Sequence, residues 1–175
     1  STDKIVLEMF NISTQSTYKI HTEKHNVYSS IIYKISISSA KLKNDLINKG
    51  CVPNKSLILT FPKFIHKDLI HHFIRGYFDG DGSVYNYYAS RSDRRNKQYI
   101  IECSFNGNIY MLKQIQLYLG LPNTVLKVDK RGYKGASIIS FKGKKRCIDF
   151  YNYIYSNANI FLERKKDIFK NYFNI

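Results

Sequence analysis

The chain has 175 residues, of which 43% are hydrophobic and 15% aromatic, and this composition excludes a disordered protein. Its 28 Lys and Arg outnumber 13 Asp and Glu, and the net charge of +15 favours a polyanionic partner, with a solvated basic surface as the alternative. No apolar run approaches the roughly 18 residues of a membrane span, so we expect an intracellular protein without a membrane partner. Cys51, Cys103 and Cys147 lack the spacing of a zinc site or a disulfide framework, and we expect buried thiols in a reducing compartment.

The first third of the chain predicts a helix, a hairpin and a second helix. Residues 3–12 carry apolar residues at the spacing of an amphipathic helix. Residues 17–38 are rich in β-branched and aromatic residues with partial alternation, which predicts two paired strands. A helix is predicted over 38–50, with Ser at its start and Gly50 just past its end, and a proline-bounded connector follows over 52–62.

The remainder predicts a longer series of the same kinds of element. A helix is expected over 68–78, stopped by the sequence "DGDG", and two strands follow over 82–90 and 98–105. Their connecting loop is charged, which favours contact with solvent or phosphate. The later predicted elements are a helix over 108–120, a hairpin over 124–143, and helices over 144–155 and 163–173.

Part of this order is repeated. Residues 33–48 align without gaps on 137–152, placing Ile35 on Ile139 and Asp45 on Asp149, although chance similarity between two hairpin-helix units is the alternative. We therefore predict a partial first repeat, residues 1–67, and a complete second repeat, residues 68–175. Because the helix and hairpin of 68–105 have no counterpart in the first repeat, we expect the chain to be a fragment or a separate subunit.

The segment "IRGYFDGDG", residues 74–82, places two carboxylates at the end of a helix. Gly76 costs about 1 kcal/mol relative to alanine inside a helix, which is tolerable if another helix packs closely there. Gly80 and Gly82 flank Asp81 with permissive backbone, so the carboxylate can point outward. Carboxylates are disfavoured at the negative end of a helix unless a cation compensates, and a divalent metal would do so. A simple helix stop is the alternative, and an EF-hand loop would need a third acidic position and a final glutamate.

This segment, in this order of elements, resembles the signature of the LAGLIDADG homing endonucleases, with Gly76 at the packing glycine and Asp81 at the metal-binding position. The resemblance implies an α+β fold with a pseudo-twofold repeat, in which antiparallel strands form a saddle over the DNA major groove and two motif helices pack together. It also implies a site-specific endonuclease that hydrolyses double-stranded DNA with Mg2+ or another divalent cation.

The resemblance also assigns roles within the site. Asp81 and the Gly80 carbonyl would hold the metal, whereas Asp79 would be structural. A basic catalytic residue is expected after the last helix of each repeat, at Lys55 and Lys165. Arg164 or Lys166 could replace Lys165, and solvated lysines at helix ends are the alternative.

Strand alternation predicts the DNA-reading surface. It places Ser83, Tyr85 and Tyr87 on one face, which we expect to meet the groove. Basic residues expected to contact DNA lie in the two hairpins that contain residues 82–105 and 124–143. They are Arg91, Arg94, Arg95, Lys97, Lys127, Lys130, Arg131 and Lys134.

One departure from the family pattern is that the chain has a single acidic motif. A paired site would then need upstream residues, a second motif-bearing chain or self-association through the motif helix. The rival interpretation is a cleavage-inactive nucleic-acid-binding protein on the same scaffold, either an RNA-splicing maturase or a DNA-binding regulator.

Overall fold

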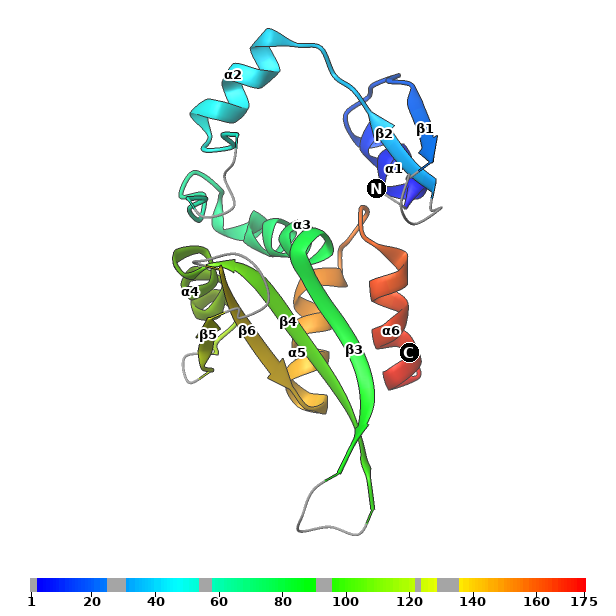
Figure 1. Ribbon diagram of the computed structural model, residues 1–175, viewed down its shortest axis with the longest axis vertical. Helices are drawn as coiled ribbons and strands as arrows, with labels where there is room; N and C mark the ends of the chain where they lie inside the picture. Colours follow the sequence, from blue (N-terminus) through cyan, green and yellow to red (C-terminus); the bar gives the residue numbers. More distant parts are fainter. Residues whose placement is uncertain (1–2, 25–30, 54–57, 91–95, 122–123, 129–135) are drawn as a thin grey trace.

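The computed structural model describes residues 3–24, 31–53, 58–90, 96–121, 124–128 and 136–175. Its centre is an antiparallel sheet with the strand order β3-β4-β6-β5 (Figure 1). The four strands are β3 (Gly82–Ala89), β4 (Gln98–Asn108), β5 (Leu126–Val128) and β6 (Ala136–Lys142). The predicted strands are confirmed, and β4 runs three residues beyond its predicted end because Asn106, Gly107 and Asn108 pair with β6.

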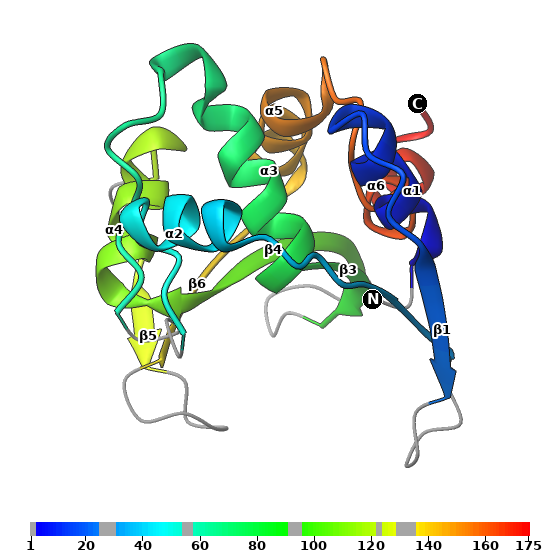
Figure 2. The same ribbon diagram turned by 90° about the horizontal axis from the view of Figure 1, so that it is seen from above.

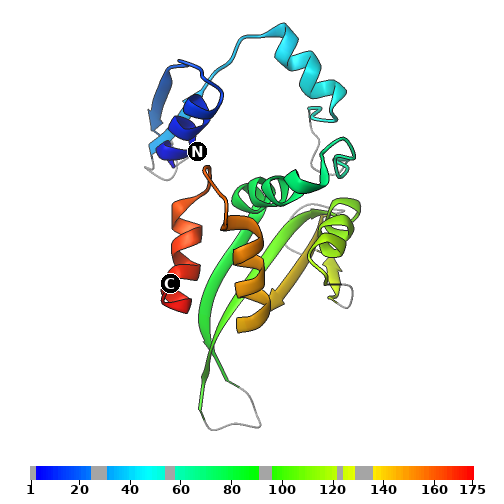
Figure 3. The ribbon, with the colours of Figure 1, turned by 180° about the vertical axis from the view of Figure 1, so that it is seen from behind.

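Helices cover one face of this sheet. They are α3 (Ile70–Asp81), preceded by a short 3-10 turn (Lys67–Leu69), α4 (Ile109–Tyr118), α5 (Lys144–Tyr155) and α6 (Glu163–Phe173). Figure 3 shows α5 and α6 lying along the sheet, with α3 across one end of it. The bounds of α5 and α6 agree with the predicted ones, since apolar residues in both segments recur at the helical period.

The core is an aromatic cluster that joins these helices to the sheet. The fully buried ring of Phe78 lies 5.3 Å from that of Phe105 on β4 and 5.0 Å from that of Phe150 on α5, measured between centroids. Phe169 on α6 packs against the same group, 6.3 Å from Phe78. Burying such rings supplies about 3–5 kcal/mol each, judged from truncation to alanine, so Phe78 anchors α3 firmly.

The end of α3 differs from the prediction. The helix continues through Asp81, and β3 begins at once at Gly82, whereas the sequence predicted a stop after Phe78. The Gly82 N–H donates to the Phe78 carbonyl, and a side chain at residue 82 would strike Phe78. The last glycine of the motif therefore lets the chain turn directly from helix into strand.

Gly82→Ala is expected to destabilise the protein by about 2 kcal/mol, because the new Cβ would lie 2.7 Å from the carbonyl oxygen and 2.9 Å from the Cα of Phe78. Both atoms belong to the backbone and cannot rotate away. Gly76→Ala, in the same helix, is the matched control: nothing lies within 4 Å of its Cβ, so alanine should stabilise by about 1 kcal/mol. Urea unfolding measures both variants, and equal midpoints would contradict this difference.

The N-terminal elements form an arch beyond α3, on the side opposite to the four-stranded sheet (Figure 1). The arch consists of α1 (Lys4–Ser13), β1 (Ile20–Lys24), β2 (Ile31–Ile35) and α2 (Ala40–Asn48), with β1 and β2 paired antiparallel. Ser39 caps α2 by accepting from the Leu42 N–H, and Gly50 has the positive φ expected after a helix end. The order α1, β1, β2, α2 matches α4, β5, β6, α5, so the α+β fold contains a pseudo-twofold repeat.

The arch is joined to the rest by few side chains. Seen from above, α1 overlies α6 (Figure 2), and the two ends are linked where the Arg164 Nε is 3.3 Å from the Asp3 carboxylate. Along the described part of residues 3–60, no residue is buried. Cys51, at the end of the arch, is accordingly exposed, so the expectation of a buried thiol is wrong there, whereas Cys103 and Cys147 are buried as expected.

No helix within the described ranges is both long enough and apolar enough to cross a membrane.

Candidate functional site

The C-terminal end of α3 presents Asp81 to solvent. Asp81 is exposed as the last residue of the helix, and Gly80 before it is also exposed, with no atom within 4 Å of an added Cβ. The neighbours Phe78 and Gly82 are buried and fix this turn. The site thus combines a rigid support with an accessible carboxylate.

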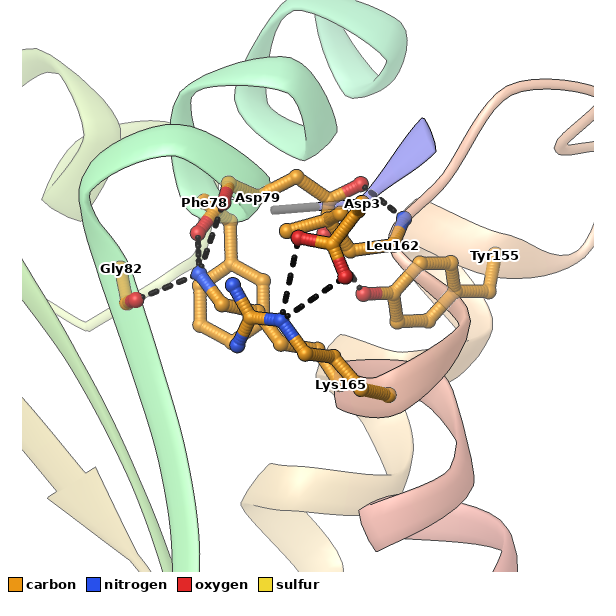
Figure 4. A network of polar contacts seen from close by, with 8 residues as sticks. Asp3, Phe78, Asp79, Gly82, Tyr155, Leu162 and Lys165 are labelled. Carbon is orange, nitrogen blue, oxygen red and sulfur yellow. Dashed lines mark hydrogen bonds and ion pairs between the residues drawn. The ribbon is translucent and has the colours of Figure 1, made fainter. Parts of the chain in front are cut away.

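Asp79 points the other way, into the protein (Figure 4). Its Oδ1 accepts a hydrogen bond from the Tyr155 hydroxyl and its Oδ2 one from the Leu162 N–H, both at 3.0 Å. Burial raises the pKa of the Asp79 carboxyl above its ordinary value. Asp79 therefore has the structural role expected for it, tying α3 to α5 and to the start of α6.

Lys165, on α6, reaches the end of α3. Its Nζ donates to the carbonyl oxygens of Phe78 and Gly82 at 2.6 Å and of Asp79 at 2.9 Å (Figure 4). The last carbonyls of a helix have no partner within the helix and carry partial negative charge, so a buried cation satisfies both needs. Burial lowers the pKa of Lys165, yet three accepting carbonyls require the three N–H donors of the ammonium form.

The geometry separates the candidates for the basic position. Lys165 lies directly behind the turn that presents Asp81, whereas Arg164 pairs with Asp3 and the Lys166 ammonium lies 4.0 Å from the ring centroid of Phe161. Lys55 lies outside the described residues. Catalytic roles for Lys165 and Lys55 remain predictions.

Arg75 is a site residue that the sequence reasoning missed. It is 7% exposed, its Nε donates to the Ile160 carbonyl at 2.8 Å, and its Nη1 donates to the Ile154 carbonyl at 3.0 Å and lies 2.7 Å from the Nδ1 of His72. These contacts fix α3 against the segment between α5 and α6. The sequence spacing could have revealed this role. Arg75 lies four residues, about one helical turn, before Asp79, so both side chains lie on the face of α3 that meets the segment between α5 and α6.

The donor set around Asp81 fits part of a divalent metal site. Mg2+ takes oxygen ligands, often one or two carboxylates with several waters. The Asp81 carboxylate and the Gly80 carbonyl are of that type, while the Asp79 carboxylate and the Gly82 carbonyl already accept hydrogen bonds. Over the described stretches, no group of three or more His, Cys, Asp or Glu could hold a metal ion. The described residues therefore supply part of a divalent metal site and not the whole of one.

The helix packing predicted at Gly76 is not made among the described residues, because a Cβ there would meet no atom within 4 Å. Gly76 is exposed and, one turn away, Gly80 is exposed as well. Residues spaced by four lie on one face of a helix, so α3 carries an open strip without side chains. Packing of a second helix at this strip remains a prediction.

The sheet face away from the helices carries the predicted reading residues. Tyr85 is 45% exposed while its neighbour Val84 is 7% exposed, which confirms that Ser83, Tyr85 and Tyr87 share the outer face. Across the strands, Tyr85 pairs with Glu102, which pairs with Lys142 on β6. We call this outer face of β3, β4, β5 and β6 the strand face.

Two of the basic residues predicted to contact DNA belong to the described part of the chain. Lys127 is exposed on β5 opposite Ile138, and this register places it on the strand face, while Lys97 is exposed just before β4. Sequence reasoning missed Glu102 and Lys142, although alternation from the buried Phe141 would have placed Lys142 on the strand face. Six further predicted contacts lie outside the described residues: Arg91, Arg94, Arg95, Lys130, Arg131 and Lys134.

The antiparallel sheet is open on one face, helices cover the other, and α3 ends in an exposed carboxylate. Solved structures share this α+β fold. The meganuclease I-SmaMI, bound to uncleavable DNA, matches 99% of this chain and 76% of its own with a TM-score of 0.60 and 14% identity. The archaeal intron-encoded I-Vdi141I, complexed with DNA, matches 62% of this chain and 69% of its own with a TM-score of 0.50 and 17% identity.

A third structure is the homing endonuclease I-CvuI with a DNA target in the presence of Mg, matching 61% of this chain and 65% of its own with a TM-score of 0.50 and 18% identity. No family model matches the sequence, and no curated protein matches it either. The chain has the fold of the LAGLIDADG homing endonucleases, as its motif predicted.

Proposed function

We propose that the chain is part of a site-specific homing endonuclease that hydrolyses both strands of a duplex DNA target with a divalent metal. The observation that carries this proposal is the exposed Asp81 at the end of α3, held in place from behind by Lys165 and set beside the strand face. The similar structures I-SmaMI and I-Vdi141I are bound to DNA, which supports the same partner for this chain.

Each residue of the site would have a separate task. Asp81 and the Gly80 carbonyl would bind Mg2+, which when bound supplies Lewis acidity for hydrolysis of a phosphodiester. Lys165 holds the carbonyls of the helix end and so sets the direction of Asp81. Asp79 and Arg75 hold α3 against α5 and α6, so the position of the carboxylate follows that of the core.

Cleavage of both strands needs a second acidic group, which we expect from upstream residues, from a second motif-bearing chain or from self-association. The open glycine strip of α3 supports this expectation, because it leaves room for a second helix to approach closely.

A cleavage-inactive binding protein on the same scaffold is the second candidate, as an RNA-splicing maturase or a DNA-binding regulator. Its supporting observation is the single acidic motif in the sequence. A tight, salt-resistant complex with structured intron RNA, and no cutting of any duplex, would favour it.

The deciding experiment exposes the purified chain to a randomised library of duplex DNA, first with magnesium and then with calcium, and sequences the bound and cut molecules. Recurrent cutting of both strands at one site supports an active nuclease. Recurrent binding without cutting supports a reading surface that lacks its second acidic group. Absence of any recurrent site contradicts DNA recognition by this chain.

DNA affinity is expected to depend steeply on salt. Neutralising about 6–10 phosphates would lower affinity by about a thousandfold or more between 50 and 200 mM salt. Lys127→Ala should reduce the slope of log affinity against log salt by about 1, since Lys127 lies on the strand face. Lys170→Ala, on the helix-covered side, is the matched control and should leave the slope unchanged. Fluorescence anisotropy titrations at several salt concentrations measure both slopes. If Lys127→Ala had the same slope as Lys170→Ala, Lys127 would not contact the DNA.

A further inference from the structure

Two thiols meet in the core, between β4 and α5. The Cys103 Sγ lies 3.9 Å from the Cys147 Sγ, and both side chains are 0% exposed. A disulfide has an S–S distance of about 2.05 Å, so the two sulfurs would have to approach by about 2 Å to bond, which a small movement of the start of α5 can supply. The proposed nuclease reaction uses neither thiol.

Cys147 is the better nucleophile of this pair. The Cys103 thiol donates a hydrogen bond to the Cys147 sulfur, and this bond lowers the pKa of Cys147, whereas burial raises the pKa of Cys103. The Arg146 guanidinium next along the chain also lowers the pKa of Cys147. Because the thiolate is the reactive form of cysteine, a peroxide should react first at Cys147.

The first turn of α5 is the route from solvent to this thiol. Cys147 is the fourth residue of the helix, and Gly143 at the N-cap has no side chain to accept from the N–H groups of that turn. The turn contains no acidic residue, while Lys144 and Lys145 put positive charge at the positive end of the helix. It borders a pocket of about 400 Å3 that Lys142, Gly143 and Lys144 help to line. A helix end held so weakly opens more often than the rest of the helix, and each opening exposes Cys147.

We propose that Cys103 and Cys147 form a redox-sensitive clamp between β4 and α5, which a peroxide closes when the first turn of α5 opens. With hydrogen peroxide, the Cys147 thiolate attacks one oxygen, so that an S–O bond forms, the O–O bond breaks and the leaving hydroxide takes up a proton to become water. The Cys103 thiol then attacks the oxidised sulfur, so that the S–S bond forms, the S–O bond breaks and the Cys103 proton leaves with the hydroxide as a second water. The two thiols are oxidised by two electrons in all, and the peroxide is reduced to two waters.

The closed clamp would join the sheet of the second repeat to its helices. Cys103 follows Glu102 of the strand face, and α5 ends in Tyr155, whose hydroxyl holds Asp79 of α3. A disulfide between residues far apart in the chain restricts the unfolded state, so the oxidised protein should resist unfolding more than the reduced one. The clamp needs neither DNA nor a metal, so it goes beyond the nuclease proposal and is tested separately from it.

The test treats the full chain with hydrogen peroxide, after Cys51→Ser has removed the exposed thiol. We expect the intact mass to fall by two hydrogens and a linked pair of peptides to contain Cys103 and Cys147. The Tm should rise by about 5–10 °C, and dithiothreitol should reverse the rise. Cys103→Ala in the same background is the matched control, which keeps Cys147 and should show neither the link nor the rise. Because this substitution changes the core, each variant is compared with itself, with and without peroxide.

Two exposed lysines test the route through the first turn of α5. Lys144→Glu adds negative charge to that turn and should slow closure of the clamp by about two- to fivefold, because the turn opens less often. Lys113→Glu makes the same change in the middle of α4 and should leave the rate unchanged. Equal rates in these two variants would overturn the proposal. Thiols that stay reduced, oxidation to sulfinic acid without a link, or a link without the rise in Tm would each overturn it as well.

Discussion

Asp81→Asn is expected to abolish metal-dependent cleavage by the complete enzyme while leaving DNA affinity within about twofold. The amide keeps the size of the side chain but removes the charge that would hold the metal, and a loss on the order of a thousandfold in rate corresponds to about 4 kcal/mol. Because Asp81 is exposed at the helix end, the core should be unaffected. Binding with calcium and cutting with magnesium are measured on one duplex target.

Asp79→Asn is the matched control for this prediction. Its amide oxygen can still accept from the Leu162 N–H, and its NH2 group can donate to the Tyr155 hydroxyl, so the link between α3 and α5 survives. We expect this variant to retain cleavage within about tenfold. Full cleavage by Asp81→Asn, or equal loss in both variants, would exclude Asp81 as the metal ligand.

The order of elements could be predicted because it is encoded locally. Apolar spacing, the Ser39 cap and the positive φ of Gly50 depend on neighbours within a few residues, and they gave α2 and the later helices close to their observed bounds. Alternation likewise placed Tyr85 on the open face and Val84 in the core.

The interior contacts of the site could not be predicted in this way. Arg75 and Lys165 are charged residues of types usually found on the surface. Both are buried because carbonyl oxygens 79 to 87 residues away along the chain accept hydrogen bonds from them. The position where α3 ends depends on the same distant contact. The sequence predicted a stop after Phe78, whereas Lys165 donates to the carbonyls of Phe78 and Gly82 at the end of the longer helix. The opposite error was made at Cys51, a residue of a type common in cores that is exposed in a part of the chain where no described residue is buried.

Lys165→Met is expected to lower the free energy of unfolding by about 3 kcal/mol. Methionine keeps an unbranched apolar stem, so the loss comes chiefly from the carbonyls of Phe78, Asp79 and Gly82, which would lose their buried donor. Lys166→Met, the next residue of α6, is the matched control. Its ammonium lies over the Phe161 ring rather than on carbonyls, and its removal should cost about 1 kcal/mol or less.

Measuring cleavage together with stability shows whether Lys165 positions the helix end or takes part in the reaction itself. If Lys165 acts by holding the helix end, cleavage and stability should fall together, and Lys165→Arg, which keeps the charge, should recover part of both. If Lys165 instead takes part in the reaction, Lys165→Met should lose cleavage while its urea midpoint stays near that of the unaltered protein. The contacts favour the first result, because Lys165 is 5% exposed and the three N–H donors of its ammonium already meet three carbonyls, leaving none for a substrate.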